Sequence, residues 1–215
     1  MPTIKKLLIT AFLFNLLSFQ SFAAEEIRFL PPAAVAKNQQ TITRIQDYLT
    51  HLTTIISDFT QTAPDGSLTS GKFFLERPGK MRWQYNPPTP ILMVSNGSEM
   101  VYYDYELEQA SHLPLDQTLI GFLAEPVITF DGKIGITEFS SDAGAIRITL
   151  VQRDKSDEGS LMLEFSDHPL LLRNMVVRDA GKQVTTVSLN NARFGIKMDP
   201  ELFIFREPGK RRKIH

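Results

Sequence analysis

The sequence contains no cysteine among its 215 residues, and this absence excludes several kinds of protein. Disulfide-stapled scaffolds, thiolate catalysis, cysteine-ligated zinc and iron–sulfur clusters all depend on that residue. A lipid anchor attached through a cysteine is excluded for the same reason. The fold must therefore be stabilised by packing, and the chain cannot be acylated at an N-terminal cysteine.

An excess of charge of one sign is lacking as well. The chain has 23 basic and 24 acidic residues, so no global field favours nucleic acid or an anionic membrane surface. We therefore expect no nucleic-acid partner. The length predicts a single domain that is large enough to bury a core.

Long apolar runs are limited to one, over residues 7–19, which is shorter than the roughly 20 residues of a membrane-spanning helix. Two lysines precede it, and small residues at Ser21 and Ala23 follow it. This order predicts a secretory signal peptide over residues 1–23, with a lone N-terminal anchor helix as the alternative. The folded domain is then expected over residues 24–215, exported to the periplasm of a Gram-negative bacterium; a eukaryotic secretory route stays open.

One amphipathic helix is predicted over residues 38–52. Its apolar residues recur at steps of three and four, whereas Arg44, Gln46 and Asp47 take the opposite side. The apolar positions are Ile42, Ile45, Leu49 and Leu52. Such a helix lies with one face on an apolar surface.

From Ile55 onward the period changes to two, which is typical of β-strands. Turn signals such as Asn96-Gly97 separate the strands and favour hairpins. Strands are expected over residues 55–61, 72–77, 81–85, 91–95, 100–103, 134–139, 145–151, 161–165, 170–178 and 183–191. A helical insert is expected between Asp116 and Phe130. The pattern thus predicts about ten or eleven antiparallel strands in one strongly curved sheet or barrel.

Motifs that carry chemistry are weak in this chain. Residues 66–72 match the start of a phosphate-binding loop, but Phe73 stands where Ser or Thr should bind magnesium, and a strand follows where a helix is needed. No two of the four histidines have metal-ligand spacing; they are His51, His112, His168 and His215. We therefore predict no catalytic residue, no metal site and no cofactor.

An acidic group, Asp104, Glu106 and Glu108, alternates along the chain and is expected on one face of a strand. Weak cation binding there is one interpretation, and a solvated strand end is the other.

The hairpin around Arg77 is rich in apolar side chains. Period two places Phe73, Leu75 and Arg77 on one face of the first strand. The return strand likewise places three residues together: Met81, Trp83 and Tyr85. Two interpretations stay open from the pattern alone. One is a fully packed small barrel, and the other is an apolar face, partly covered by helices, that holds an apolar ligand.

The same hairpin carries a family resemblance. The run Arg77-Pro78-Gly79-Lys80-Met81-Arg82-Trp83-Gln84-Tyr85 resembles the periplasmic outer-membrane lipoprotein carrier (LolA) family. Further matches are Phe59-Thr60-Gln61, Asp65-Gly66, Gly71-Lys72-Phe73, Val94-Ser95-Asn96-Gly97, Tyr103-Asp104, Val187-Ser188-Leu189-Asn190-Asn191 and Leu202-Phe203. The likeness spans nearly all of the chain after the predicted signal peptide.

This resemblance implies a mainly β fold with an α-helical lid, in which a single antiparallel sheet is curved into an unclosed half-barrel. It implies a lipid-binding cavity lined by Phe59, Phe73, Leu75, Met81, Trp83, Tyr85, Leu119, Phe122 and Leu123. Arg77 matches the family arginine that forms hydrogen bonds with the lid. An additional C-terminal strand, present in some members, is not expected here, because little follows Phe205 except a basic tail.

The resemblance also implies the function and the partners. The expected function is a monomeric, non-enzymatic carrier of triacylated lipoproteins. It would receive them from an inner-membrane ABC transporter and deliver them to an outer-membrane receptor. The alternatives are a lipid- or lipoprotein-sensing regulatory domain of the same fold, or a protein like the receptor itself. That receptor is anchored through a cysteine, which this chain lacks.

Overall fold

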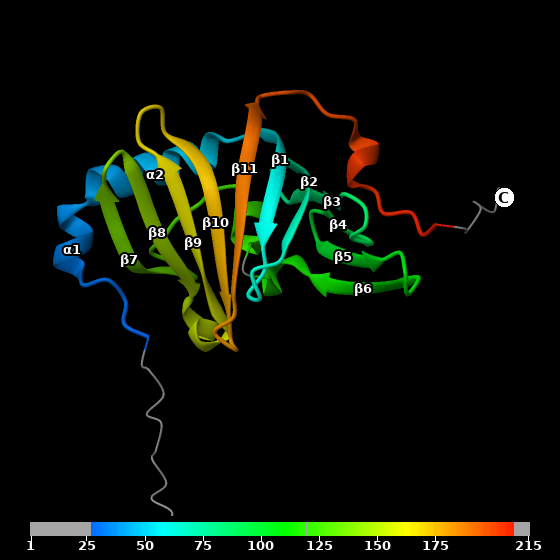
Figure 1. Cartoon of the computed structure of the whole chain (residues 1–215). Helices are drawn as coiled ribbons and strands as arrows, with labels where there is room; N and C mark the ends of the chain where they lie inside the picture. The colour runs from blue at the N-terminus through cyan, green and yellow to red at the C-terminus, as the bar shows by residue number, and fades with distance from the viewer. Residues whose placement is uncertain (1–26, 119, 209–215) are drawn as a thin grey trace, which may run out of the picture.

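The computed structural model describes residues 27–118 and 120–208, and eleven antiparallel strands in them form one sheet (Figure 1). The strand order is β6-β5-β4-β3-β2-β1-β11-β10-β9-β8-β7. The first strand pairs with the last, and β6 and β7 are the two edges of a sheet that does not close. The predicted single, unclosed antiparallel sheet is confirmed.

The strands agree with the period-two pattern over most of the chain. Their bounds are β1 Thr54–Thr62, β2 Leu68–Glu76, β3 Lys80–Tyr85, β4 Ile91–Asn96, β5 Glu99–Asp104, β6 Gln109–Pro114, β7 Ile134–Asp142, β8 Ala145–Gln152, β9 Gly159–Ser166, β10 Leu171–Asp179 and β11 Val184–Phe194. Residues 68–76 form β2, so the segment that resembles a phosphate-binding loop leads into a strand.

The predicted amphipathic helix is present as α2, Gln39–His51, and its apolar side buries Ile42, Ile45 and Leu49. A short helix, α1 (Pro32–Lys37), precedes it and was not predicted. Its proline at the first position suits a helix start, whereas its six residues are too few to show a helical period. Helix α2 lies across one face of the sheet, called here the inner face (Figure 1).

A helical insert was predicted between Asp116 and Phe130, but the described residues of this segment do not form a regular α-helix. Residues 115–130 are called here the insert, and its described residues form two short 3₁₀ helices, η1 (Leu115–Gln117) and η2 (Gly121–Ala124). At Gly121 a Cβ atom would collide with the carbonyl oxygen of Leu115, so the chain folds back on itself there. The following Pro126 opposes regular helix, because it lacks an N–H donor.

The prediction of an alternating acidic face at residues 104–108 is wrong. Residues 105–108 form a turn, in which Asp104 Oδ1 accepts hydrogen bonds from the amides of Glu106 and Leu107 at 2.8 and 3.0 Å. The edge strand β6 follows and was not predicted. Every residue of β6 is exposed, so it lacks the buried alternation from which strands are recognised.

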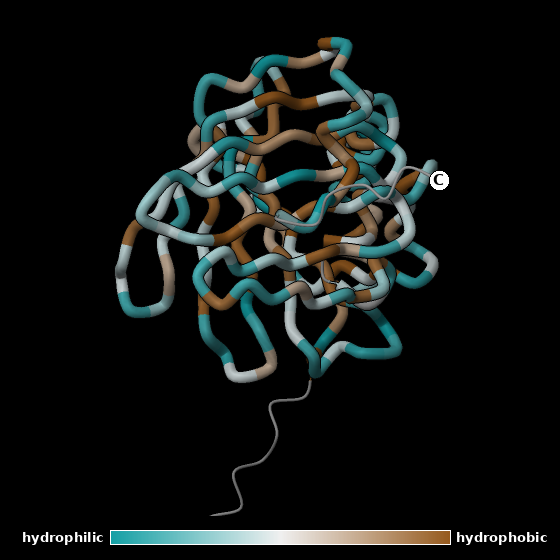
Figure 2. Tube along the Cα trace, turned by 90° about the vertical axis from the view of Figure 1, so that its right-hand side faces the viewer, coloured by the Kyte–Doolittle hydropathy of each residue, from teal (hydrophilic) through white to brown (hydrophobic). Residues whose placement is uncertain are grey.

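Apolar side chains form two clusters on opposite faces of the sheet. The inner cluster joins α2 and the insert to the inner face of most strands. The outer cluster consists of Leu92, Val94 and Tyr103, and Phe205 packs against it. The C-terminal segment covers this second cluster: Arg82 Nη1 donates to the carbonyl oxygen of Leu202 at 3.1 Å. Figure 2 shows mostly hydrophilic turns around more hydrophobic strands.

The predicted signal peptide and the basic tail at residues 210–213 lie outside the described residues. Within the described ranges, no helix combines the length and the apolar character that crossing a membrane requires.

Candidate functional site

The side chains predicted to line a cavity are brought together in the inner cluster. Seven of them are almost fully buried: Phe59, Phe73, Leu75, Met81, Trp83, Phe122 and Leu123. Tyr85 is partly buried and packs against the same cluster. Leu119 lies outside the described residues. In this structure the predicted lining is closed from solvent, and its side chains pack against one another.

The pairing of β2 with β3 explains how these side chains meet. Phe73 lies opposite Trp83, and Leu75 lies opposite Met81. The rings of Phe73 and Trp83 are 4.2 Å apart between centroids. This confirms the prediction that both strands of the hairpin turn their apolar residues to one face.

Gly71 allows Phe59 to lie over β2. A Cβ atom at this position would collide with the ring of Phe59 and with the carbonyl oxygen of Gln84. Phe59 then meets Tyr85 edge-on, with the ring centroids 5.1 Å apart. The absence of a side chain at residue 71 thus makes room for an aromatic pair beside the hairpin.

Tyr85 adds a polar group at the margin of this apolar surface. Its hydroxyl donates a hydrogen bond to Gln61 Oε1 at 2.7 Å. Burial raises the pKa of Tyr85 to about 12 from its ordinary value of 10. The phenol is therefore neutral at physiological pH, and it does not bring a charge to the inner cluster.

Arg77 connects the hairpin to the insert. It follows β2 directly, and its amide donates to the carbonyl oxygen of Thr53 at 2.8 Å. The Nη2 atom of its side chain donates to two backbone carbonyl oxygens of the insert, those of Glu125 and Pro126. Burial lowers the pKa of Arg77, but a guanidinium keeps its charge at any physiological pH.

Two further polar contacts hold the insert. The amide of Ile128 donates to Thr50 Oγ1 on α2 at 3.2 Å. Gln152 Nε2, at the end of β8, donates to the carbonyl oxygen of Asp116 at 3.0 Å. These contacts, like those of Arg77, join a side chain to backbone. The insert also buries apolar side chains in the inner cluster, among them Leu115, Ile128 and Phe130.

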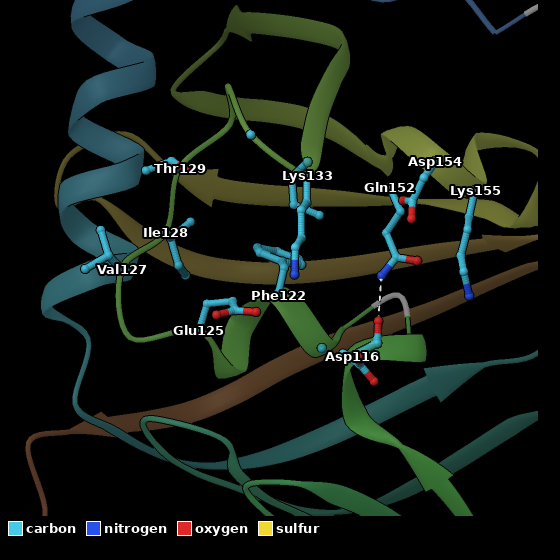
Figure 3. A pocket seen from close by; sticks show the side chains of 13 residues that line it. Asp116, Phe122, Glu125, Val127, Ile128, Thr129, Lys133, Gln152, Asp154 and Lys155 are labelled. Atoms are coloured by element: carbon cyan, nitrogen blue, oxygen red, sulfur yellow. Dashed lines mark hydrogen bonds between the residues drawn. The ribbon is translucent and has the colours of Figure 1, made fainter.

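A groove of about 510 Å³ runs between the insert and the edge of the sheet at β7 and β8 (Figure 3). Its apolar lining comes from Phe122, Val127, Ile128 and Ile134, and Val127 is 65% exposed. Charged side chains also line it: Asp116, Glu125, Lys133, Asp154 and Lys155. The groove therefore combines apolar and charged side chains at the surface beside the insert.

Two of the described histidines each pair with a carboxylate, and both histidines are exposed. In the described ranges, no group of three or more potential metal ligands is close enough to hold an ion. His112 pairs with Glu99 at 3.1 Å, and His168 with Asp167 at 3.3 Å; both histidine side chains are more than half exposed. Among the described residues, the site is thus an apolar surface that the insert covers.

Sequence reasoning missed the acceptors of Arg77 and the groove. The acceptors are backbone carbonyls, which no residue type reveals. For the groove a signal was present, because Val127 and Ile128 are apolar and directly follow Pro126.

Several known proteins are similar to this chain in sequence. A family model described as outer membrane lipoprotein carrier protein LolA matches residues 50–206. Two relatives named outer-membrane lipoprotein carrier protein are each 32% identical to this chain. The one from Methylococcus capsulatus aligns over 77% of this chain and 83% of its own length, and the one from Azotobacter vinelandii over 80% and 86%.

Among solved structures, a LolA superfamily protein from Nitrosomonas europaea aligns over 77% of this chain and 97% of its own, with a TM-score of 0.42 and 13% identity. The family assignment rests on the sequence matches, since they cover the hairpin around Arg77, the insert and the sheet. The chain therefore belongs to the LolA family of outer-membrane lipoprotein carrier proteins.

Proposed function

We propose that this protein carries triacylated lipoproteins across the periplasm of a Gram-negative bacterium. It would bind their acyl chains on the inner face of the sheet, between α2, the insert and the β2–β3 hairpin. The observation that carries this proposal is the insert: an irregular segment that covers an aromatic and aliphatic face and is held by a few side-chain-to-backbone contacts.

The energetics suit a carrier. Each methylene transferred from water to an apolar environment contributes about 0.8 kcal/mol, so long acyl chains bind tightly wherever they are covered. The closed form opposes this gain, because opening it breaks the contacts of Arg77 and of Thr50 with the insert. The net free energy of binding is therefore the gain from burying the acyl chains minus the cost of opening the insert. This weaker net binding allows the cargo to be transferred to the next protein.

This proposal assigns the remaining roles to partners. An inner-membrane ABC transporter would supply the released lipoprotein, and an outer-membrane receptor would accept it. The chain itself would act as a monomer and without catalysis, after removal of a signal peptide over residues 1–23. The acyl-chain surface would consist of the predicted cavity residues, and Arg77 would stabilise the closed form.

Native mass spectrometry of the protein, purified from the periplasm of a host that exports it, tests the proposal. The expected species is a one-to-one complex with an intact triacylated lipoprotein. Free fatty acids or deacylated peptides in its place would indicate a lipid hydrolase and would contradict the carrier function. A second exported protein, purified in parallel, controls for lipid that adheres without specificity.

The substitution Arg77→Leu tests the role of the insert. We expect the variant to take up a lipopeptide with ether-linked chains, which offers Arg77 no ester carbonyl, and to release it several times more slowly, because the closed form has lost the bonds that compete with the ligand. The measurement is transfer of a fluorescent lipopeptide to acceptor vesicles. The matched control is Arg82→Leu on the opposite face of the same hairpin, since Arg82 contacts the C-terminal segment. Equal release rates for Arg77→Leu and the unchanged protein would refute this role.

A further inference from the structure

The guanidinium of Arg77 has more donors than the insert uses. Its Nη2 atom donates to the carbonyl oxygens of Glu125 and Pro126. The Nε and Nη1 atoms are buried, and neither has a hydrogen-bond partner among the described residues. Buried donors of a charged group are nearly always paired in proteins, so these two atoms are unusual and call for an acceptor.

The contacts that Arg77 already makes indicate which acceptor fits. Both of its recorded acceptors are neutral carbonyl oxygens of the backbone. A planar guanidinium presents its donors in a fixed fork, so further carbonyl oxygens can be bound along its remaining edges. The closed form thus shows this side chain acting as a carbonyl-binding group.

The position of Arg77 relates these donors to the apolar surface. Phe73 and Leu75 point to the inner face of β2, about 7 Å apart, and Arg77 follows the strand directly, with its side chain bound to the insert over that same face. Leu75 and Phe73 are almost fully buried in the inner cluster, and Arg77 is partly buried at its end. A carbonyl bound to Arg77 would therefore stand where a hydrocarbon chain enters the row of apolar side chains.

We propose that the Nε and Nη1 atoms of Arg77 bind the ester carbonyl oxygens at the base of the cargo's acyl chains. This inference rests on the proposed carrier function and makes it more specific. The site recognises an acylated ligand by its linkage as well as by its hydrocarbon. When the insert leaves, the donors that held Glu125 and Pro126 become available to the same linkage region.

Two synthetic lipopeptides test this inference. One carries two hexadecanoyl chains as glycerol esters, and the other carries two hexadecyl chains as glycerol ethers, which lack the carbonyl groups. Dissociation constants for both are measured by fluorescence titration with the full chain, purified after export. We expect the ester ligand to bind about tenfold more tightly, as a hydrogen bond to a charged group implies.

The variants Arg77→Met and Arg82→Met separate carbonyl binding from closure of the insert. Loss of the insert contacts changes the affinity for both ligands equally, so only the ratio of the two constants reports on the carbonyl contact. Arg77→Met is expected to bring this ratio close to one. Arg82→Met, on the opposite face of the hairpin, is expected to leave it unchanged.

Each outcome is decisive. A ratio near one in the unchanged protein, measured before any variant is made, overturns the inference. So does a ratio that survives Arg77→Met, because Arg77 then acts only through the insert. If the protein binds free hexadecanoate more tightly than its methyl ester, Arg77 binds an anion and not a carbonyl oxygen. This result would also overturn the inference. Failure to bind either lipopeptide overturns the carrier function itself, and the inference with it.

Discussion

Helix α2 and the insert cover the same face of the sheet in different ways. Helix α2 has thirteen residues, of which Ile42, Ile45 and Leu49 are buried, and its backbone forms its own hydrogen bonds. The insert also buries apolar side chains, but the regular structure in its described residues is limited to two short 3₁₀ helices. Leu123 in the insert is as deeply buried as Leu49 in α2, whereas the described backbone of the insert is much less regular.

Their connections to the sheet differ as well. Helix α2 contacts the loop and strands of the β9–β10 hairpin through Arg44, which pairs with Asp167, and through Tyr48. The ring of Tyr48 meets Phe165 edge-on at 5.7 Å. The insert is connected through the side chains of Arg77, Thr50 and Gln152, and at its start through the amide of Leu115, which donates to the carbonyl oxygen of Ser98. Under the proposed carrier function, helix α2 is an integral part of the fold, whereas the insert is the cover that an apolar ligand would replace.

The largest expected effect comes from matched truncations in the two covers. Leu49→Ala removes a side chain of α2 with 0% exposure, and we expect it to lower the free energy of unfolding by about 3 kcal/mol. Leu123→Ala removes an equally buried side chain of the insert, with 1% exposure. Its effect is limited to the free energy that keeps the insert closed, about 2 kcal/mol or less.

Urea unfolding of both variants measures these losses, with the slope of the transition as a check that the unfolded surface is unchanged. A loss for Leu123→Ala that equals or exceeds that for Leu49→Ala would remove the distinction between the two covers.

Hydrogen exchange of the ligand-free protein tests the same difference without a substitution. We expect the amides of residues 121–128 to open at a cost lower by about 2 kcal/mol than those of residues 42–49. This corresponds to exchange about thirtyfold faster. Mass spectrometry of peptides from the two segments measures the rates. Addition of an acylated ligand should change the exchange of the insert and leave that of α2 nearly the same. Equal protection of both segments would argue against an exchangeable cover.

A smaller effect is expected from Tyr48→Phe. The hydroxyl of Tyr48 accepts a hydrogen bond from the amide of Leu172 at 3.2 Å, and burial raises the pKa of this phenol. Removal of the hydroxyl leaves the amide without that acceptor, which we expect to cost about 1 kcal/mol of unfolding free energy. Thermal unfolding near neutral pH measures the loss. An unchanged midpoint would show that this contact does not help to hold α2.

The smallest expected effect comes from Arg44→Ala. Arg44 and Asp167 form an ion pair at 3.1 Å, and their side chains are 39% and 24% exposed. Solvent screens such a pair, so its loss is expected to cost about 0.5 kcal/mol or less. The unfolding midpoint in urea, at low and at moderate salt, measures it. A cost well above 1 kcal/mol would show that the attachment of α2 depends on this pair more than on its buried leucine and isoleucines.

The parts of the fold that follow from local rules were predictable. Strand β2 alternates Gly71, Phe73 and Leu75 toward the inner face, and the turn at Gly79 returns the chain so that Trp83 meets Phe73. Helix α2 was predictable because its apolar residues repeat at helical steps. In both cases the apolar residues recur with the period of the backbone, two residues in a strand and about 3.6 in a helix. Such an element can therefore be recognised from its own sequence, without knowing which elements pack against it.

Strand β6 and the insert lie outside these rules. Strand β6 is exposed throughout, and it is a strand because β5 offers it hydrogen bonds, not because of its own pattern. The insert contains apolar residues at nearly helical spacing, but the close approach at Gly121 prevents a regular helix. Their conformations depend on neighbours that are distant in sequence or on contacts within a loop.

The candidate site, too, has one part that was predictable from the sequence and another that was not. By itself the sequence determined a family, a curved antiparallel sheet and an apolar hairpin face that ends in Arg77. Only the tertiary structure decided that the acceptors of Arg77 are the carbonyl oxygens of Glu125 and Pro126, and that two of its nitrogen atoms are buried without a recorded partner. The physical reason is that side-chain period is a local property, whereas backbone acceptors are identical at every residue and become distinct only through their place in the fold.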